Sequence, residues 1–463
     1  SSDGKTLRPA YLVWDLKKLF PKLVVTEEEA LLMTQRELTP GEGLEFVIRG
    51  VRDRYLGVDE SWKELYTWYR QNEGQKVDRI LDAGFFKKKP DALTGEEAAE
   101  LYGEKKQFSV TRMERFSACA YAHFLTYGLH LSDRERYEFE AMDLGNIAHQ
   151  SMERFARKAQ EKRMPWPKLE EVQRDAMIEE SVEESIKDYG NTVLYSTARN
   201  EYMIVRIKQL IRRSVWALTR QMEKGDFEPS GYEMNFGSGK IDRVDTCEDE
   251  DVVYVKVTDY KTGMKSFDIV ALYHGLQMQL PVYLNAALEL EERRASGKTV
   301  EPAGIFYYRI KDPIVDREKD DHALEEKILK ELRLDGMINA KEEVIEHLEH
   351  QLSGTSVLNP IGKNKDGSLN RYSKVLPPEA FAAMLSYTKK KEARVKRQIY
   401  AGEVQANPYE LNGSTGCDYC AYRDICGFDP RLDGYAYRSL EKYSKEEVIR
   451  RMEEEIENRE EPS

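Results

Sequence analysis

The sequence predicts an α/β fold in which a few strands are set among many helices. Two runs rich in Val, Ile and Tyr, residues 240–247 and 252–261, have the composition of strands. The acidic run between them, residues 248–251, is typical of a solvated turn, so the two runs are expected to pair as a hairpin. Residues 304–315 are predicted to form a third strand. Elsewhere apolar residues recur at helical spacing, as in residues 139–160.

Composition and charge bound the class of protein. The chain has 463 residues, 40% hydrophobic and 33% charged, which indicates more than one domain or one large domain with a real core. The net charge of −13 disfavours broad, non-specific binding of nucleic acid but leaves room for a local basic channel. No run approaches the roughly twenty apolar residues of a membrane span. Five cysteines indicate an intracellular, cytoplasmic protein without a disulfide scaffold. The polar first residues lack Met, so we expect part of a longer protein.

The first 105 residues are predicted to be helical, because their apolar side chains recur at helical spacing. Four aromatic side chains there could stack on bases, but packing between helices is the favoured interpretation: Trp62, Tyr66, Trp68 and Tyr69.

The next two helices carry candidate functional residues. Residues 108–131 form the first, and its Cys119 is by itself best interpreted as a small core residue. The second, residues 139–160, places His149 and Glu153 one turn apart at the edge of its apolar stripe. A lone histidine there is usually structural. Together with the charged group of Asp242, Asp259 and Lys261 later in the chain, His149 becomes a candidate metal ligand or proton carrier.

The hairpin holds the candidate site. Side chains alternate along a strand, so Asp259 and Lys261 project to one side and Tyr260 to the other. Pairing of the two strands brings Asp242 beside Asp259. Two carboxylates and a lysine on one sheet face can hold a divalent cation and steady an anion near it. Surface charges on a solvated sheet face are the alternative interpretation.

A long helix over residues 266–297, interrupted at Pro281, is expected after the hairpin, with Gln279 and Tyr283 sharing a face. Two helical regions are rich in Lys and Arg, residues 165–230 and 378–400. A solvated face is the default interpretation of such runs and nucleic-acid contact the alternative.

The cysteines near the C-terminus have the spacing of a metal site. Cys417, Cys420 and Cys426 form C-x2-C-x5-C, in which close thiolates can share one centre. Three thiolates leave one ligand position of a four-ligand centre vacant, and Cys119 is the natural candidate for the fourth ligand. Cys247 is left over and is not expected to bind anything. The spacing does not separate zinc from an iron–sulfur cluster.

Together these segments resemble the RecB-type nuclease domain of the PD-(D/E)XK superfamily, and most closely that of the AddB family in bacterial AddAB helicase–nucleases. The resemblance rests on five patches in order across residues 109–429: the Cys119 segment, GNIAHQSME (145–153), GKIDRVD (239–245) with VTDYKTG (257–263), LQMQLPVY (276–283) and CDYCAYRDICGFD (417–429). It implies a restriction-endonuclease-like core with a small mixed sheet flanked by helices.

The resemblance also implies roles for individual residues. His149, Asp242 and Asp259 are expected to ligate a catalytic Mg²⁺ or Mn²⁺ ion. Lys261 is expected to orient the attacking water or to stabilise charge at the phosphate.

Further positions match the family as well. Gln279 and Tyr283 match a Q-x-x-x-Y element that supports the site or the DNA, and Glu153 matches a G-x-x-x-H-x-x-x-E pattern without a defined role. The four ligands of a [4Fe–4S] cluster are matched by Cys119, Cys417, Cys420 and Cys426.

The leading hypothesis is therefore a Mg²⁺-dependent DNA exonuclease acting on single-stranded DNA. The resemblance implies that an AddA-like helicase–nuclease subunit unwinds this DNA within a heterodimer, in double-strand-break repair by homologous recombination. A catalytically idle DNA-binding or scaffold module stapled by its cluster is the alternative. A zinc-stabilised hydrolase of a non-nucleic substrate is a third possibility.

Three segments are expected. Residues 1–105 would be the end of a truncated helicase-like region, residues 106–430 the nuclease domain closed by the cluster, and residues 431–463 a charged helical tail.

Overall fold

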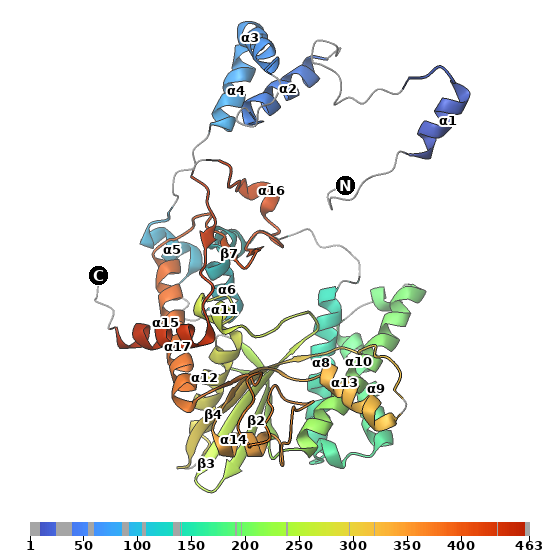
Figure 1. Ribbon diagram of the computed structural model, residues 1–463, viewed down its shortest axis with the longest axis vertical. Helices are drawn as coiled ribbons and strands as arrows, with labels where there is room; N and C mark the ends of the chain where they lie inside the picture. The colour runs from blue at the N-terminus through green and yellow to red at the C-terminus, as the bar shows by residue number, and fades with distance from the viewer. Residues whose placement is uncertain are drawn as a thin grey trace. The chain divides into compact units, whose positions relative to one another are not determined.

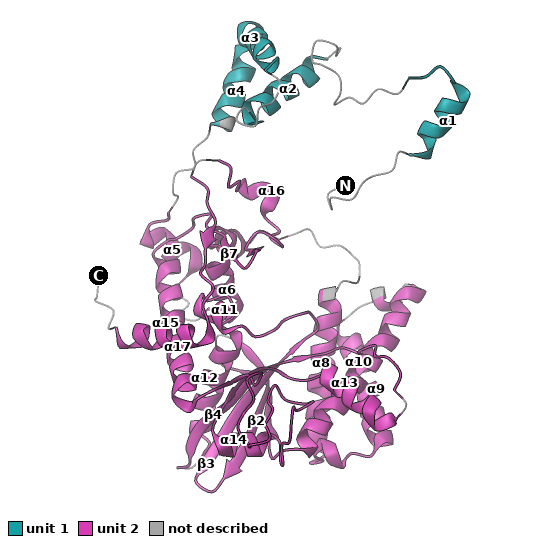
Figure 2. Ribbon diagram, viewed as in Figure 1, with its two compact units in different colours: residues 1–89 teal, residues 90–463 magenta. Residues whose placement is uncertain are grey.

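The computed structural model describes residues 10–24, 39–53, 60–85, 92–103, 108–132, 139, 141–189, 192–195, 197–237, 239–295, 297–318, 320–432 and 434–458. By compactness the chain divides into two units, Ser1–Lys89 and Pro90–Ser463 (Figure 2). The sequence placed a boundary after residue 105 instead. The difference arises because α5 (Gly95–Tyr102) packs Ala98 and Tyr102 into the core of the second unit. Within the described ranges, no helix has both the length and the apolar character needed to cross a membrane.

The first unit is helical, as predicted. Its helices are α1 (Tyr11–Leu19), α2 (Pro40–Asp53), α3 (Trp62–Asn72) and α4 (Gly74–Gly84). The aromatic residues of α3 mainly serve packing: Tyr69 is buried with Val47 and Val77, and Trp62 and Tyr66 lie against them.

The second unit is built on a six-stranded mixed sheet of order β1-β2-β3-β4-β5-β6. The strands β1 to β3 are antiparallel, β4 runs parallel to β3, β5 antiparallel to β4, and β6 parallel to β5. Their bounds are Glu228–Asn235, Lys240–Asp249, Val252–Lys261, Thr299–Arg309, Asp335–Asn339 and Val375–Leu376. The small mixed sheet predicted from the sequence is thereby confirmed.

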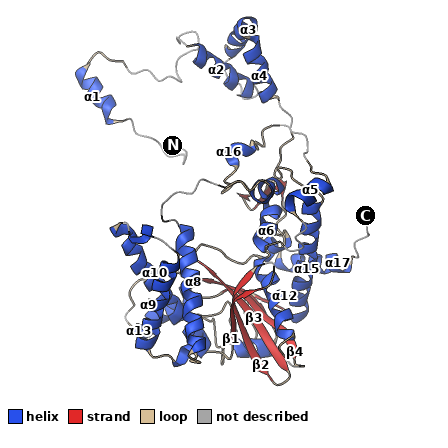
Figure 3. Ribbon diagram, turned by 180° about the vertical axis from the view of Figure 1, so that it is seen from behind, coloured by secondary structure: helices blue, strands red, loops and turns tan. Residues whose placement is uncertain are grey.

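Helices cover both faces of this sheet, and each face has its own apolar core (Figure 1). Alternation along β3 supplies both cores: Val255 and Val257 face one, whereas Tyr254 and Tyr260 face the other. The first face is covered by α6 (Val110–Ala118), α11 (Ile269–Tyr273), α12 (Gln279–Glu292), α15 (Pro378–Tyr400) and α17 (Lys445–Glu457). The second is covered by α8 (Ala141–Glu161), α9 (Glu171–Asp188), α10 (Ala198–Glu223), α13 (Asp321–Glu331) and α14 (Glu342–Leu348). Seen from behind, the sheet lies between these two helical layers (Figure 3).

Two predicted elements have different bounds. The first half of the acidic run belongs to a strand, because β2 continues to Asp249 and only Glu250 and Asp251 form the turn. The third strand begins at Thr299 and ends at Arg309, since it follows β3 along its whole length.

The predicted long helix over residues 266–297 is two helices, and the break lies before Pro281. Gly275 adopts a positive φ of 81° between α11 and α12, which ends the first helix. Pro281 is the third residue of α12, where the missing N–H is not needed for an intrahelical bond.

The helix predicted at 108–131 is likewise interrupted. Cys119 is extended and ends α6, and the chain resumes as α7 (Ala120–His123) and a π-helical turn, Phe124–Gly128. A second, three-stranded sheet consists of β7 (Tyr409–Leu411), β8 (Ser414–Thr415) and β9 (Arg438–Ser439), and the short helix α16 (Arg423–Cys426) lies between β8 and β9 in the sequence. The charged C-terminal helix α17 is confirmed, and its Val448 and Met452 are buried in the main core.

Candidate active site and cysteine cavity

The ends of β2 and β3 bring two predicted carboxylates together. Arg243 pairs with Thr258, so Asp242 and Asp259 lie opposite each other one step further along the ladder. The backbone N–H of Tyr260 donates to Asp242 Oδ2 over 2.7 Å, which fixes that carboxylate at the strand end.

His149 reaches the same carboxylate from α8. Its Nδ1 lies 3.2 Å from Asp242 Oδ2. Burial alone would lower the pKa of His149, but the hydrogen bond and charge of Asp242 outweigh burial and raise it. A Cβ on Gly145 would lie 3.1 Å from Thr262 Oγ1, so a residue without a side chain lets α8 approach the segment after β3. The helix is thereby placed to present an imidazole to the strand ends.

Glu233 on β1 completes a group that sequence reasoning missed. One ligand atom from each of His149, Glu233 and Asp242 lies within 4.8 Å of the others. Tyr232 pairs with Arg243 and Met234 with Ile241, so Glu233 stands across from Asp242. Burial raises the pKa of Glu233, Lys240 opposes this effect, and the Asp242 charge adds to it. Glu153, whose charge also reaches Glu233, is paired with Arg157 at 2.8 Å.

Asp259 is almost fully buried and held from two sides. Lys261 Nζ forms an ion pair with its Oδ2, and Gln279 Nε2 donates to its Oδ1 over 2.9 Å. Gln279 Nε2 also lies 2.9 Å from Tyr283 Oη, so the Q-x-x-x-Y pair acts as one unit. Burial raises the pKa of Asp259, and the neighbouring Asp242 raises it further.

These residues fit a divalent cation. Two carboxylates and one imidazole converge, a third carboxylate, Asp259, lies opposite Asp242 on the next strand, and oxygen ligands with one histidine suit Mg²⁺ or Mn²⁺. The raised pKa values of Asp259 and Glu233 arise from burial and from carboxylate charges near one another, which a bound cation relieves. His149, Glu233 and Asp242 form the preassembled set, whereas Asp259 is engaged by Lys261 and Gln279.

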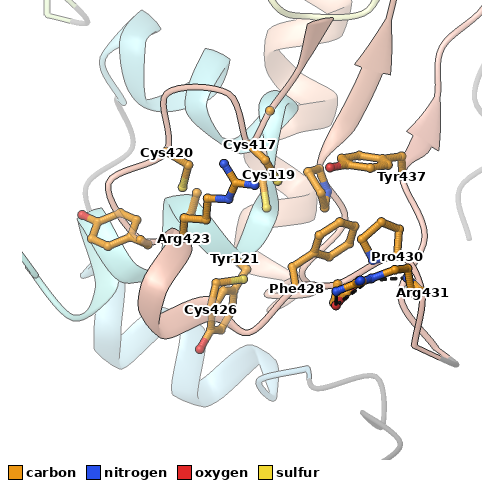
Figure 4. Close-up of a pocket in the computed structure, with 15 residues that line it drawn as sticks. Cys119, Tyr121, Cys417, Cys420, Arg423, Cys426, Phe428, Pro430, Arg431 and Tyr437 are labelled. Carbon is orange, nitrogen blue, oxygen red and sulfur yellow. Dashed lines mark hydrogen bonds and ion pairs between the residues drawn. The ribbon is translucent and has the colours of Figure 1, made fainter. Parts of the chain in front are cut away.

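The four predicted cluster cysteines line one cavity of about 380 Å³ (Figure 4). Cys119 ends α6, and the other three lie in the loop from β8 through α16: Cys417, Cys420 and Cys426. Burial raises the pKa of the Cys417 thiol, and the other three thiols raise it further. A Cβ on Gly416 would lie 2.9 Å from the Ala118 carbonyl, so the two cysteine segments touch closely. Cys247 is buried on β2 in the other core, away from this set.

Many Lys and Arg side chains of the two basic helices form ion pairs with carboxylates of the same unit. On α10, Lys208 and Arg212 pair with carboxylates of α9, and Arg213 pairs with Asp312. On α15, Lys389 pairs with Glu289, Arg394 with Glu455 and Lys396 with Glu392. These pairings support structural roles for the basic residues named.

Residues 107–427 match the sequence model of the PD-(D/E)XK nuclease superfamily, and the chain belongs to that superfamily. Among curated proteins, it is 37% identical over 96% of its length to the B subunit of the ATP-dependent helicase/deoxyribonuclease from Lachnoclostridium phytofermentans, of which it covers 40%. It is 32% identical to the proteins of that name from Alkaliphilus oremlandii and Caldanaerobacter subterraneus, over 98% and 96% of the chain and 42% and 41% of those proteins. These relatives are AddB proteins, and the chain spans about two fifths of their length.

Proposed function

We propose that this chain is a divalent-metal-dependent deoxyribonuclease domain that hydrolyses phosphodiester bonds of single-stranded DNA. The observation that carries the proposal is the convergence of His149, Glu233 and Asp242, with Asp259 opposite Asp242 on the next strand and paired with Lys261. Phosphodiester hydrolysis requires a nucleophilic water, an aligned phosphate and stabilisation of additional negative charge. The set contains a residue suited to each requirement.

His149, Glu233 and Asp242 would hold the ion, and Asp259 would join them by exchanging its ion pair with Lys261 for the ion. Mg²⁺ is the natural occupant and Mn²⁺ the alternative. When bound, the ion supplies Lewis acidity at the phosphoryl group and favours ionisation of water.

The chain's own residues supply the remaining functions. Lys261 places a fixed positive charge beside the reacting oxygens, where negative charge develops. The Gln279 amide holds Asp259 Oδ1, so the second oxygen remains directed toward Lys261 and the site. The Tyr283 hydroxyl positions that amide in turn.

We further propose that the cysteine cavity holds a [4Fe–4S] cluster. Four thiols at one cavity match the required ligand number, and about 380 Å³ leaves room for a group larger than a single ion. The cluster would connect α6 with a loop nearly 300 residues later and so staple the two ends of the nuclease domain, residues 106–430.

The names of the relatives support a place in a helicase–nuclease complex. We propose an AddA-like helicase–nuclease subunit as the partner, exonucleolytic cleavage of the strand that it unwinds, and double-strand-break repair by homologous recombination in the cytoplasm as the setting. Residues 1–105 would then be the end of a helicase-like region.

Cleavage of labelled single-stranded DNA tests the proposal. We expect the chain to release nucleotides with Mg²⁺ and not with EDTA, and Lys261→Ala to lower the rate about 100- to 1,000-fold. Lys298→Ala is the matched control, because Lys298 pairs with the exposed Glu248 at the opposite end of β2. Equal activity of the wild type and Lys261→Ala would refute the proposed site. Inactivity of both, with the cluster intact, would favour the idle DNA-binding module.

A further inference from the structure

Glu114 contacts the helix that carries Gln279, although no sequence pattern predicts a role for it. It lies on α6, and its Oε1 accepts the backbone N–H groups of Met278 over 2.7 Å and of Gln279 over 3.0 Å. These residues are 164 and 165 positions apart from Glu114, so the contact exists only in the folded unit.

The start of α12 needs such an acceptor. The first N–H groups of a helix lack intrahelical partners, and Ser, Thr, Asp or Asn at the N-cap usually accepts from them. Met278 occupies the N-cap of α12, and its own side chain makes no capping bond to the described residues. Glu114 supplies the missing acceptor from another helix.

The capped residue Gln279 also contacts Asp259 of the candidate site. Gln279 is the first residue of α12. The hydrogen bond from its backbone N–H to Glu114 therefore also determines the position from which its side-chain amide extends. That amide donates to Asp259 Oδ1 and to Tyr283 Oη. The position of Asp259 therefore depends on where α12 starts.

The turn between α11 and α12 also packs closely against α6 at Gly275. A Cβ on Gly275 would lie 2.7 Å from Ser117 Oγ, which is closer than a real side chain permits. Glu114 and Ser117 are neighbours at i and i+3 on α6 and both face the approach to α12. Burial raises the pKa of Glu114, and the positive charges of Lys265 and of Lys261 oppose this effect.

We propose that Glu114 is a positioning residue of the nuclease: by capping α12 it holds Gln279 against Asp259. The inference rests on the proposed function only for its kinetic consequence. Its effect on metal affinity requires only that Asp259 binds the ion.

The test compares Glu114→Ala, Glu114→Gln and Glu97→Ala in the full chain, each with and without Gln279→Ala. Glu97 is the matched control, because its carboxylate accepts the Thr94 N–H at the start of α5 and so caps a different helix. Mn²⁺ affinity is measured by titration calorimetry without DNA, and kcat and KM are measured on single-stranded DNA.

We expect Glu114→Ala to weaken Mn²⁺ binding and to lower kcat by about tenfold, with KM little changed, as for other residues that orient metal ligands. Glu114→Gln retains an oxygen acceptor and should recover most of both quantities. Glu97→Ala should match the wild type. In the Gln279→Ala background, Glu114→Ala should add little, because the residue through which it acts is gone.

Wild-type Mn²⁺ affinity and kcat in Glu114→Ala would overturn the inference. An equal loss in the wild-type and Gln279→Ala backgrounds would also overturn it, since Glu114 would then act by another route. If the wild type binds Mn²⁺ but cleaves no DNA, the proposed function fails, while the Mn²⁺ affinities still decide the role of Glu114.

Discussion

Asp245 is the centre of a buried charge network on β2, and replacing it with Ala should destabilise the second unit strongly. Its Oδ1 accepts from Arg243 Nε over 2.6 Å, and Lys256 Nζ lies 3.4 Å from Oδ2. All three are buried, with exposed fractions of 2% for Arg243, 0% for Asp245 and 8% for Lys256. Asp245→Ala leaves two buried cations without their carboxylate, for which we expect a loss of about 3–5 kcal/mol.

The pH dependence of that loss has a definite sign. Burial lowers the pKa of Lys256, and Asp245 opposes this effect. Without Asp245 the pKa of Lys256 falls further below its value in the unfolded chain. The folded variant can then lose this proton at a lower pH than the wild type, which removes the cost of the buried charge. The destabilisation should therefore shrink as the pH rises toward the unfolded-state pKa of lysine, about 10.4.

Urea unfolding followed by circular dichroism measures the free energy of unfolding of both forms. The matched control replaces the whole network by apolar residues, Arg243→Met, Asp245→Leu and Lys256→Met. That triple variant should be more stable than Asp245→Ala, because it leaves no unpaired charge. A loss below about 1 kcal/mol in Asp245→Ala, or a triple variant that is less stable than the single one, would refute the reasoning.

Three further outcomes are expected. Gly275→Ala should lower the stability by about 1–3 kcal/mol in thermal melts, because its φ is 81° and the added Cβ would meet Ser117; an unchanged Tm would contradict this packing. The rise in Tm on adding Mn²⁺ should be larger at pH 8 than at pH 5, since the pKa values of His149, Glu233 and Asp259 are raised and protons compete with the ion for them; a pH-independent rise would contradict binding by these residues. Cys420→Ser should lose iron and visible absorbance together, measured by elemental analysis and spectroscopy, whereas zinc in the wild type would overturn the iron–sulfur assignment.

Several features of the site could be predicted because they follow from local rules. Strand alternation places Asp259 and Lys261 on one face, and hairpin pairing brings Asp242 beside them. Cys119 could be joined to the distant triplet by counting thiolates, and the four do line one cavity. Both arguments need only spacing and the number of groups.

Glu233 was missed because β1 does not have a typical strand composition. Its sequence, EPSGYEMN, contains Pro, Ser and Gly and lacks β-branched aliphatic residues. The strand forms because β2 offers a partner, which is a tertiary effect. Its position directly before the GKIDR segment was the signal available in the sequence.

Glu114 and the helix break at Gly275 were missed for a related reason. Both depend on α6 meeting the α11–α12 turn, which lies more than 150 residues later in the sequence. A proline is the strongest helix breaker, so the sequence favoured Pro281 as the interruption. In the structure the break lies where the chain packs against α6, and the proline lies in the first turn of the next helix.

The central claim is that one divalent ion binds where β1, β2 and α8 meet. Crystals of the chain soaked in MnCl₂, with diffraction recorded near the manganese edge, test it most directly. We expect one strong anomalous peak in contact with His149, Glu233 and Asp242, and its loss in Asp242→Ala crystals with an unchanged fold. A peak elsewhere, or an equally strong peak at this position in the variant, would contradict the account.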